Sequence, residues 1–143
     1  MSRTTIRTTI ILLLALMASL ISVITRQALI DCGGSSIKAE DAATAINCLF
    51  IPAHLGDTDA QEMLGAIYAY GIGTAPDFEL AKKWLSKLNY HDAGKQMLDI
   101  GNDYLYGTRA PKDITTAKAW FRAAAQHGNG EAKRQCEDLG CQE

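Results

Sequence analysis

The sequence has little net charge of either sign. Its 14 lysines and arginines nearly balance 16 aspartates and glutamates, which gives a formal net charge of −2 at pH 7. Domains that bind nucleic acids usually carry a clear excess of positive charge, at least on one face. The balance of charges here provides no such electrostatic attraction, and we therefore expect no nucleic-acid partner.

Recognisable catalytic and metal-binding motifs are also missing. The chain contains no Gly-x-Ser-x-Gly, phosphate-binding loop or dinucleotide fingerprint, and its four cysteines lack the Cys-x-x-Cys spacing of redox enzymes. The three histidines, His54, His91 and His127, do not have the close spacing of metal ligands. His91 and His127 lie 36 residues apart in expected turns, and such recurrence favours a structural role. We predict no enzyme activity, no metal and no cofactor.

One long apolar segment lies near the amino terminus. Arg3 and Arg7 precede it, and no charged residue occurs from Thr8 to Thr25. Eighteen helical residues span about 27 Å, close to the hydrocarbon thickness of a bilayer. The pattern predicts a signal anchor or a signal peptide cleaved near Thr25, with a buried core helix as a third alternative. Either of the first two exports the remainder, so we expect a periplasmic protein, anchored to the inner membrane or released.

A repeat of 36 residues organises most of the remaining chain. LGAIYAYGIGTAPD at 64–77 returns as IGNDYLYGTRAPKD at 100–113. Self-similarity at a fixed period of this size is typical of solenoids. Each unit resolves into two helices, the first at about 57–70, where Gly71 is placed to end it and Asp77 to cap the second. The pattern predicts an all-α fold.

The pattern Ala-x-x-x-Leu-Gly-x-x-Tyr-x-x-Gly-x-Gly-x-x-x-Asp-x-x-x-Ala-x-x-Trp, from Ala60 to Trp84, resembles the Sel1-like repeat, a relative of the tetratricopeptide repeat. The second unit departs from it at Gln96 and Arg109. The resemblance implies a short right-handed α/α solenoid that serves protein–protein contact and carries out no reaction. The expected divisions are a signal segment at 1–31 and a repeat domain at 32–143, with a half unit at about 41–55, full units at about 56–91 and 92–127, and a closing half unit at about 128–140.

All four cysteines, Cys32, Cys48, Cys136 and Cys141, follow the apolar segment, as expected for an exported chain with disulfides. Cys48 lies one period before Trp84, an expected core position, so Cys32 could form a disulfide with Cys48 that holds the first helices together. Cys136 and Cys141 fall at two positions that touch in a Schellman ending of a helix at 130–139. We predict the pairs 32–48 and 136–141; the alternative is four reduced thiols in small apolar positions.

A binding surface is expected on the first helix of each repeat, which tends to line the concave side of such solenoids. Removing the core positions leaves six candidate partner-binding residues: Met63, Ala66, Tyr70, Asp99, Asn102 and Tyr106. The two tyrosines combine apolar area with a hydroxyl, as binding hot spots do, although they could instead pack against the following loop. Asp99 and Asp103, one helical turn apart, are interpreted as a solvated acidic face, with a docking patch for a basic partner as the second interpretation.

These features favour an exported, non-enzymatic protein–protein interaction module. Small exported repeat proteins of this kind resemble immunity partners of bacterial effectors, including type VI lipases, so an inhibitor or immunity protein is one hypothesis. An envelope scaffold or adaptor is the alternative. A hypothesis of another class is a β-lactam-binding hydrolase, as in cysteine-rich relatives. The full repeats from Gly56 to Gln126 contain no cysteine, which counts against it.

Overall fold

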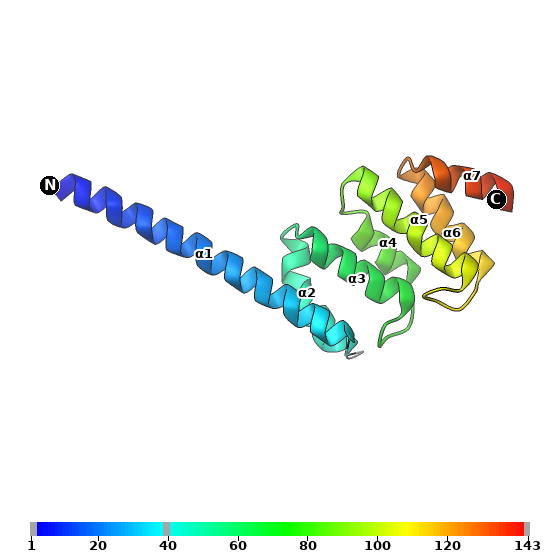
Figure 1. The fold of residues 1–143 in the computed structure, drawn as a ribbon, viewed down its shortest axis with the longest axis horizontal. Helices are drawn as coiled ribbons and strands as arrows, with labels where there is room; N and C mark the ends of the chain where they lie inside the picture. Colours follow the sequence, from blue (N-terminus) through cyan, green and yellow to red (C-terminus); the bar gives the residue numbers. More distant parts are fainter. Residues whose placement is uncertain (1–2, 39–40, 142–143) are drawn as a thin grey trace.

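The computed structural model describes residues 3–38 and 41–141, and every regular element within these ranges is a helix. The chain forms the predicted all-α solenoid behind one long amino-terminal helix (Figure 1). The helices are α1 (Arg3–Lys38), α2 (Ala42–His54), α3 (Thr58–Tyr70), α4 (Phe78–Leu85), α5 (Tyr90–Tyr106), α6 (Ile114–Gln126) and α7 (Gly130–Leu139).

The two full repeats are the helix pairs α3–α4 and α5–α6, and their ends follow the predicted signals. Gly71 ends α3 in the left-handed conformation with φ 68°, where other residues are strained. Asp77 caps α4 by accepting a hydrogen bond of 2.9 Å from the backbone N–H of Leu80. α5 begins at Tyr90, so His91 lies in its first turn and not, as predicted, in a turn between units.

Glycines let the two helices of each pair approach closely. A Cβ atom placed on Gly65 would lie 2.5 Å from Leu85, and one on Gly101 would lie 2.6 Å from Phe121. Leu85 and Phe121 are fully buried, so these positions leave room for hydrogen only. The close approach therefore requires glycine at the same position of both repeats.

The same contact occurs once more, between α1 and α2. A Cβ atom on Gly33 would lie 2.4 Å from the buried side chain of Leu49. The carboxyl-terminal part of α1 thus packs on α2 as α3 packs on α4. The half unit predicted at about 41–55 has a partner helix in α1, which runs without a break past residue 31. The division of the chain into domains at that residue stays a prediction.

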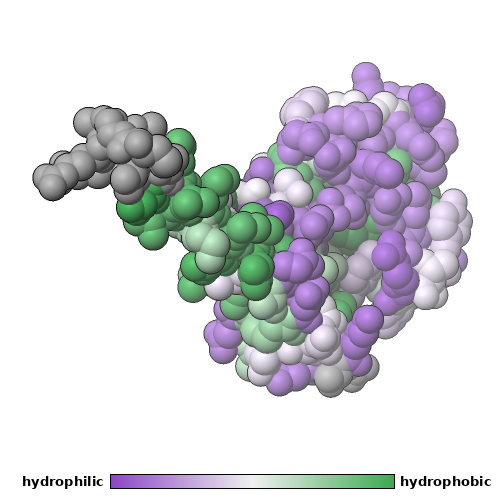
Figure 2. Space-filling view, turned by 60° about the vertical axis from the view of Figure 1, so that its left-hand side comes forward, coloured by the Kyte–Doolittle hydropathy of each residue, from purple (hydrophilic) through white to green (hydrophobic). Residues whose placement is uncertain are grey.

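The amino-terminal part of α1 projects away from the solenoid with its apolar side chains exposed (Figures 1 and 2). From Ile10 onward the helix is long and apolar enough to cross a membrane, by length and composition. A signal sequence passes the same test, so the finding confirms the predicted apolar helix and does not decide between an anchor and a cleaved signal.

The two predicted cysteine pairs differ in the structure. Cys32 of α1 and Cys48 of α2 form a disulfide, with Cα atoms 6.0 Å apart. Cys136 and Cys141 are free thiols, so the structure does not contain the predicted second bond. The predicted backbone ending is nevertheless present: Gly140 adopts φ 64°, and the N–H of Cys141 donates to the carbonyl oxygen of Cys136 at 2.8 Å. The Schellman ending forms through the backbone and needs no covalent bond.

Candidate partner-binding face

The six candidate binding residues lie on α3 and α5, and their surroundings differ strongly. In α3, Met63 is half-buried, packs against the core cluster around Leu49 and Leu64, and has its methyl group near Gly34 of α1. Ala66 is also half-buried. The end of α1 therefore covers part of the surface that the sequence assigned to the partner.

Tyr70 is held by the second repeat. Its hydroxyl donates a hydrogen bond of 2.6 Å to Oδ2 of Asp103, and its ring stacks on that of Tyr104 with centroids 6.5 Å apart. The guanidinium carbon of Arg109 lies 5.3 Å from the Tyr70 ring centroid. Burial first, and then the hydrogen bond to Asp103, raise the pKa of Tyr70 well above its ordinary value of 10.0. Tyr70 therefore joins consecutive repeats through contacts in the second repeat, and packing of the tyrosines against the loop that follows each of them stays a prediction.

Asp103 does not belong to a solvated acidic face, as the sequence had suggested. It is 7% exposed and accepts hydrogen bonds from Tyr70, from the hydroxyl of Thr108 and, at 2.7 Å, from Nε of Arg109. A buried carboxylate is stable only when paired and hydrogen-bonded, and all three donors meet this need. Asp103 fastens the α5–α6 loop and α3 to α5. Sequence reasoning missed this role, for which Arg109, a departure from the repeat pattern, was the available signal.

Of the three candidates on α5, only Tyr106 is more exposed than those on α3. Asp99 and Asn102 are half-buried, and the side chain of Tyr106 is 65% exposed. Oδ1 of Asn102 is shielded from solvent and has no hydrogen-bond partner among the described residues. The spacing 99, 102 and 106 places all three on one side of α5. We call these three residues the α5 stripe.

The charged residues of the repeats are distributed unevenly. α3 carries the carboxylates Asp59 and Glu62 and no basic residue, whereas α6 carries Lys118 and Arg122 and no carboxylate. α5 carries charges of both signs, and Lys95 lies one helical turn before Asp99 on the side of the α5 stripe.

Two of the three histidines, His54 and His127, make contacts within the repeats. The ring of His54 packs edge-on to that of Trp84, with centroids 4.9 Å apart. Nε2 of His127 lies 3.2 Å from the hydroxyl of Ser86, but Nδ1 of His127 has no partner among the described residues. The Ser86–His127 pair thus lacks the third group that orients the base in a Ser–His–carboxylate triad. Within the described ranges, no group of three or more His, Cys, Asp or Glu side chains is placed to hold a metal ion.

The two repeats match a family model. The Sel1 repeat model matches residues 58–88 and 97–129, which correspond to the α3–α4 and α5–α6 hairpins. The chain is a Sel1-repeat protein. Sel1 repeats mediate protein–protein binding, so these hairpins form an interaction module. A comparison with curated proteins finds no significant match.

Proposed function

We propose that this Sel1-repeat protein is an exported, membrane-anchored binding protein whose α5 stripe contacts a protein partner. The observation that carries the proposal is the 65% exposed side chain of Tyr106, which lies on the same side of α5 as Asp99 and Asn102. Binding hot spots are rich in tyrosine, because its side chain combines apolar area with a hydroxyl group.

The partner is proposed to present a basic segment. Asp99 lies in the stripe, and the neighbouring helix α3 carries Asp59 and Glu62 and no basic residue, whereas Lys95 is the basic residue one turn before Asp99 on α5. Attraction between exposed charges weakens with salt, because the Debye length shortens from about 10 Å at 0.1 M to about 3 Å at 1 M. A complex made through this face should therefore weaken as ionic strength rises.

Export is supported by the apolar α1 together with the Cys32–Cys48 disulfide, because disulfides persist in oxidising compartments. We place the solenoid in the periplasm, held at the inner membrane by α1. Within this function we propose the role of an inhibitor or immunity protein for a bacterial effector such as a type VI lipase. A scaffold or adaptor in the envelope would use the same surface.

The test is affinity capture of the full-length chain from detergent-solubilised envelopes of its own cells. Tyr106→Ala should weaken capture about 30-fold, since a hot-spot tyrosine contributes about 2 kcal/mol. Asp99→Lys should weaken it most at low salt. Lys83→Glu is the matched control, because it reverses an exposed charge on α4, away from the stripe. Equal capture by all four proteins would remove the α5 stripe from the interface.

The identity of the captured protein separates the finer roles. One toxin-like protein at equal stoichiometry supports immunity, whereas cell-wall or secretion components support an adaptor. Turnover of a chromogenic β-lactam that persists through further purification would contradict the non-enzymatic function.

A further inference from the structure

The corner between α2 and α3 exposes large apolar side chains. Leu55 is 82% exposed, more than any other large apolar residue in the described part of the chain, and Ile51 is 59% exposed. The two residues lie one helical turn apart and so face the same way. Isolated exposed apolar residues are common, but this pair adjoins a further apolar surface.

That further surface belongs to α1. A cavity of about 530 Å³ separates the corner from α1, with Ile51 and Leu55 on one side and Ser22, Thr25 and Leu29 on the other. Figure 2 shows hydrophobic surface running along α1 to the place where it meets the solenoid. The corner and α1 thus form two walls of one groove, which Arg26 and Asp57 also line.

The groove lies at a defined level along α1. The uncharged segment from Thr8 to Thr25 spans about 27 Å as a helix, which matches the hydrocarbon thickness of a bilayer. Ser22 and Thr25 fall in the last turn of this segment, and both line the groove. When α1 crosses a membrane, the corner therefore stands at the boundary between hydrocarbon and headgroups.

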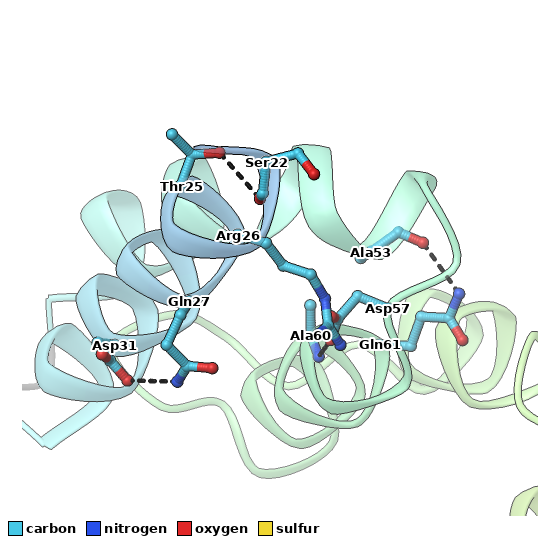
Figure 3. A network of polar contacts seen from close by, with 9 residues as sticks. All are labelled: Ser22, Thr25, Arg26, Gln27, Asp31, Ala53, Asp57, Ala60 and Gln61. Atoms are coloured by element: carbon cyan, nitrogen blue, oxygen red, sulfur yellow. Dashed lines mark hydrogen bonds and ion pairs between the residues drawn. The ribbon is translucent and has the colours of Figure 1, made fainter. Parts of the chain in front are cut away.

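Several polar groups of the corner have partners within the protein, whereas the buried Oε1 atom of Gln61 has none among the described residues (Figure 3). Nε of Arg26 pairs with Oδ2 of Asp57, which is only 6% exposed. Oδ1 of Asp57 accepts a hydrogen bond of 2.9 Å from the N–H of Ala60. The backbone N–H of Leu55 donates to the carbonyl of Ile51 at 3.0 Å. Exposed apolar side chains beside an arginine that is 53% exposed suit the boundary of a bilayer, where the apolar groups can enter the lipid and the guanidinium can reach water and headgroups.

We propose that the α2–α3 corner is a second membrane-contacting element, with Ile51 and Leu55 inserted among the lipids around α1 and an acyl chain of a phospholipid in the groove. This inference rests on the part of the proposed function that keeps α1 in the membrane. It adds a surface that the α5 stripe does not use. The corner would fix the height and tilt of the solenoid on the bilayer.

The experiment uses the full-length chain in vesicles of phosphatidylcholine and phosphatidylglycerol, with or without bromine on the acyl chains, since bromine quenches tryptophan at contact. Leu55→Trp places a reporter in the corner, and Ile51→Trp serves as a second reporter should the first variant fold poorly. Ile114→Trp is the control, at a 46% exposed position at the start of α6. The wild-type chain gives the background from Trp84 and Trp120.

Brominated lipid is expected to remove most of the emission that Leu55→Trp adds, and to leave the emission added by Ile114→Trp unchanged. Equal quenching of the two variants in chains that float with the vesicles would overturn the inference and leave the proposed function standing. Chains that do not float would overturn the anchor and this inference together. If the quenching of Leu55→Trp falls as the protein-to-lipid ratio rises, a second copy of the chain occupies the groove. That result would also overturn the inference.

Discussion

Replacing Tyr70 with phenylalanine removes one hydroxyl group and no ring contact. That hydroxyl donates 2.6 Å to the carboxylate of Asp103, which is 7% exposed. Hydrogen bonds to charged groups contribute about 1.5–3 kcal/mol to the free energy of unfolding. Thr108 and Arg109 continue to donate to the same carboxylate, so the lower end of this range applies. We expect Tyr70→Phe to cost about 1.5 kcal/mol, or about 6–12 °C in the melting temperature of a solenoid of about 100 residues.

Tyr106→Phe is the matched control, because residue 106 lies one period after residue 70. The Tyr106 side chain is 65% exposed, and its hydroxyl has no hydrogen-bond partner among the described residues. Exposed substitutions of this kind change stability by less than about 0.5 kcal/mol. Circular dichroism of the full-length variants in detergent measures both melting temperatures. If the two variants melt together, the hydroxyl of Tyr70 is not fastening the repeats and the reasoning fails.

The pH dependence of this difference gives a second measurement on the same variant. Burial and the bond to Asp103 raise the pKa of Tyr70 in the folded state above 10.0, so folding favours the neutral phenol. The stabilisation is fully present below pH 10 and is lost as the pH rises from there through the folded-state pKa. The difference in stability between wild type and Tyr70→Phe should therefore decrease above pH 10. A difference in stability that stays constant to higher pH would show that Tyr70 titrates normally.

Three further outcomes are expected. Gly101→Ala should lower the free energy of unfolding by about 1–3 kcal/mol through overpacking, as measured in a thermal melt. Gly130→Ala, with open space around the new methyl group, should leave the stability unchanged. Equal losses of stability in the two variants would contradict the close packing. Replacing the Cys32–Cys48 disulfide by two serines should cost about 3 kcal/mol in urea unfolding, through the loop that it closes, and an unchanged midpoint would contradict this. Burial and the nearby Cys141 raise the pKa of Cys136 to about 12. The alkylation of Cys136 by iodoacetamide at pH 8 should therefore be about 1,000-fold slower than that of an ordinary thiol, and it should accelerate up to about pH 12. Peptide mapping measures the rate, and an ordinary rate would contradict the raised pKa.

The repeats could be predicted from the sequence because their signals are local and occur twice. Gly71 and Asp77 end and begin helices through their own backbone conformation and capping bonds. Gly65 and its counterpart Gly101 also mark a contact that any stacked pair of helices needs. Such features depend on few neighbours, so a pattern of residues indicates them well.

The role of α1 as the first helix of a pair could not be read in the same way. Its composition is that of a signal sequence or membrane anchor, and the repeat pattern is absent from its apolar residues. The corresponding contact from Gly33 to Leu49 spans 16 residues, whereas the contact from Gly65 to Leu85 spans 20. The shorter connection removes the match at a period of 36.

The candidate site was predicted only in part, because the fate of each side chain depends on the neighbouring repeat. Tyr70 and Tyr106 occupy equivalent positions, but only Tyr70 has a following repeat that offers an aspartate at hydrogen-bonding distance. For Tyr106 the corresponding helix of the next unit is α7, where Leu139 stands one period after Asp103. The position of a repeat within the array therefore decides between a packed and an exposed tyrosine.

α1 runs without a break from the apolar segment into the first helix pair, so it connects the two rigidly. An α-helix turns by about 100° and advances about 1.5 Å per residue. A single residue inserted after Thr25 would swing the α5 stripe by about 100° around the axis of α1, whereas a flexible tether would absorb the same insertion without effect. If α1 anchors the protein as proposed, the number of helical residues in α1 therefore sets the direction of the proposed binding face relative to the membrane, and a partner held at the same membrane would meet this face in one orientation.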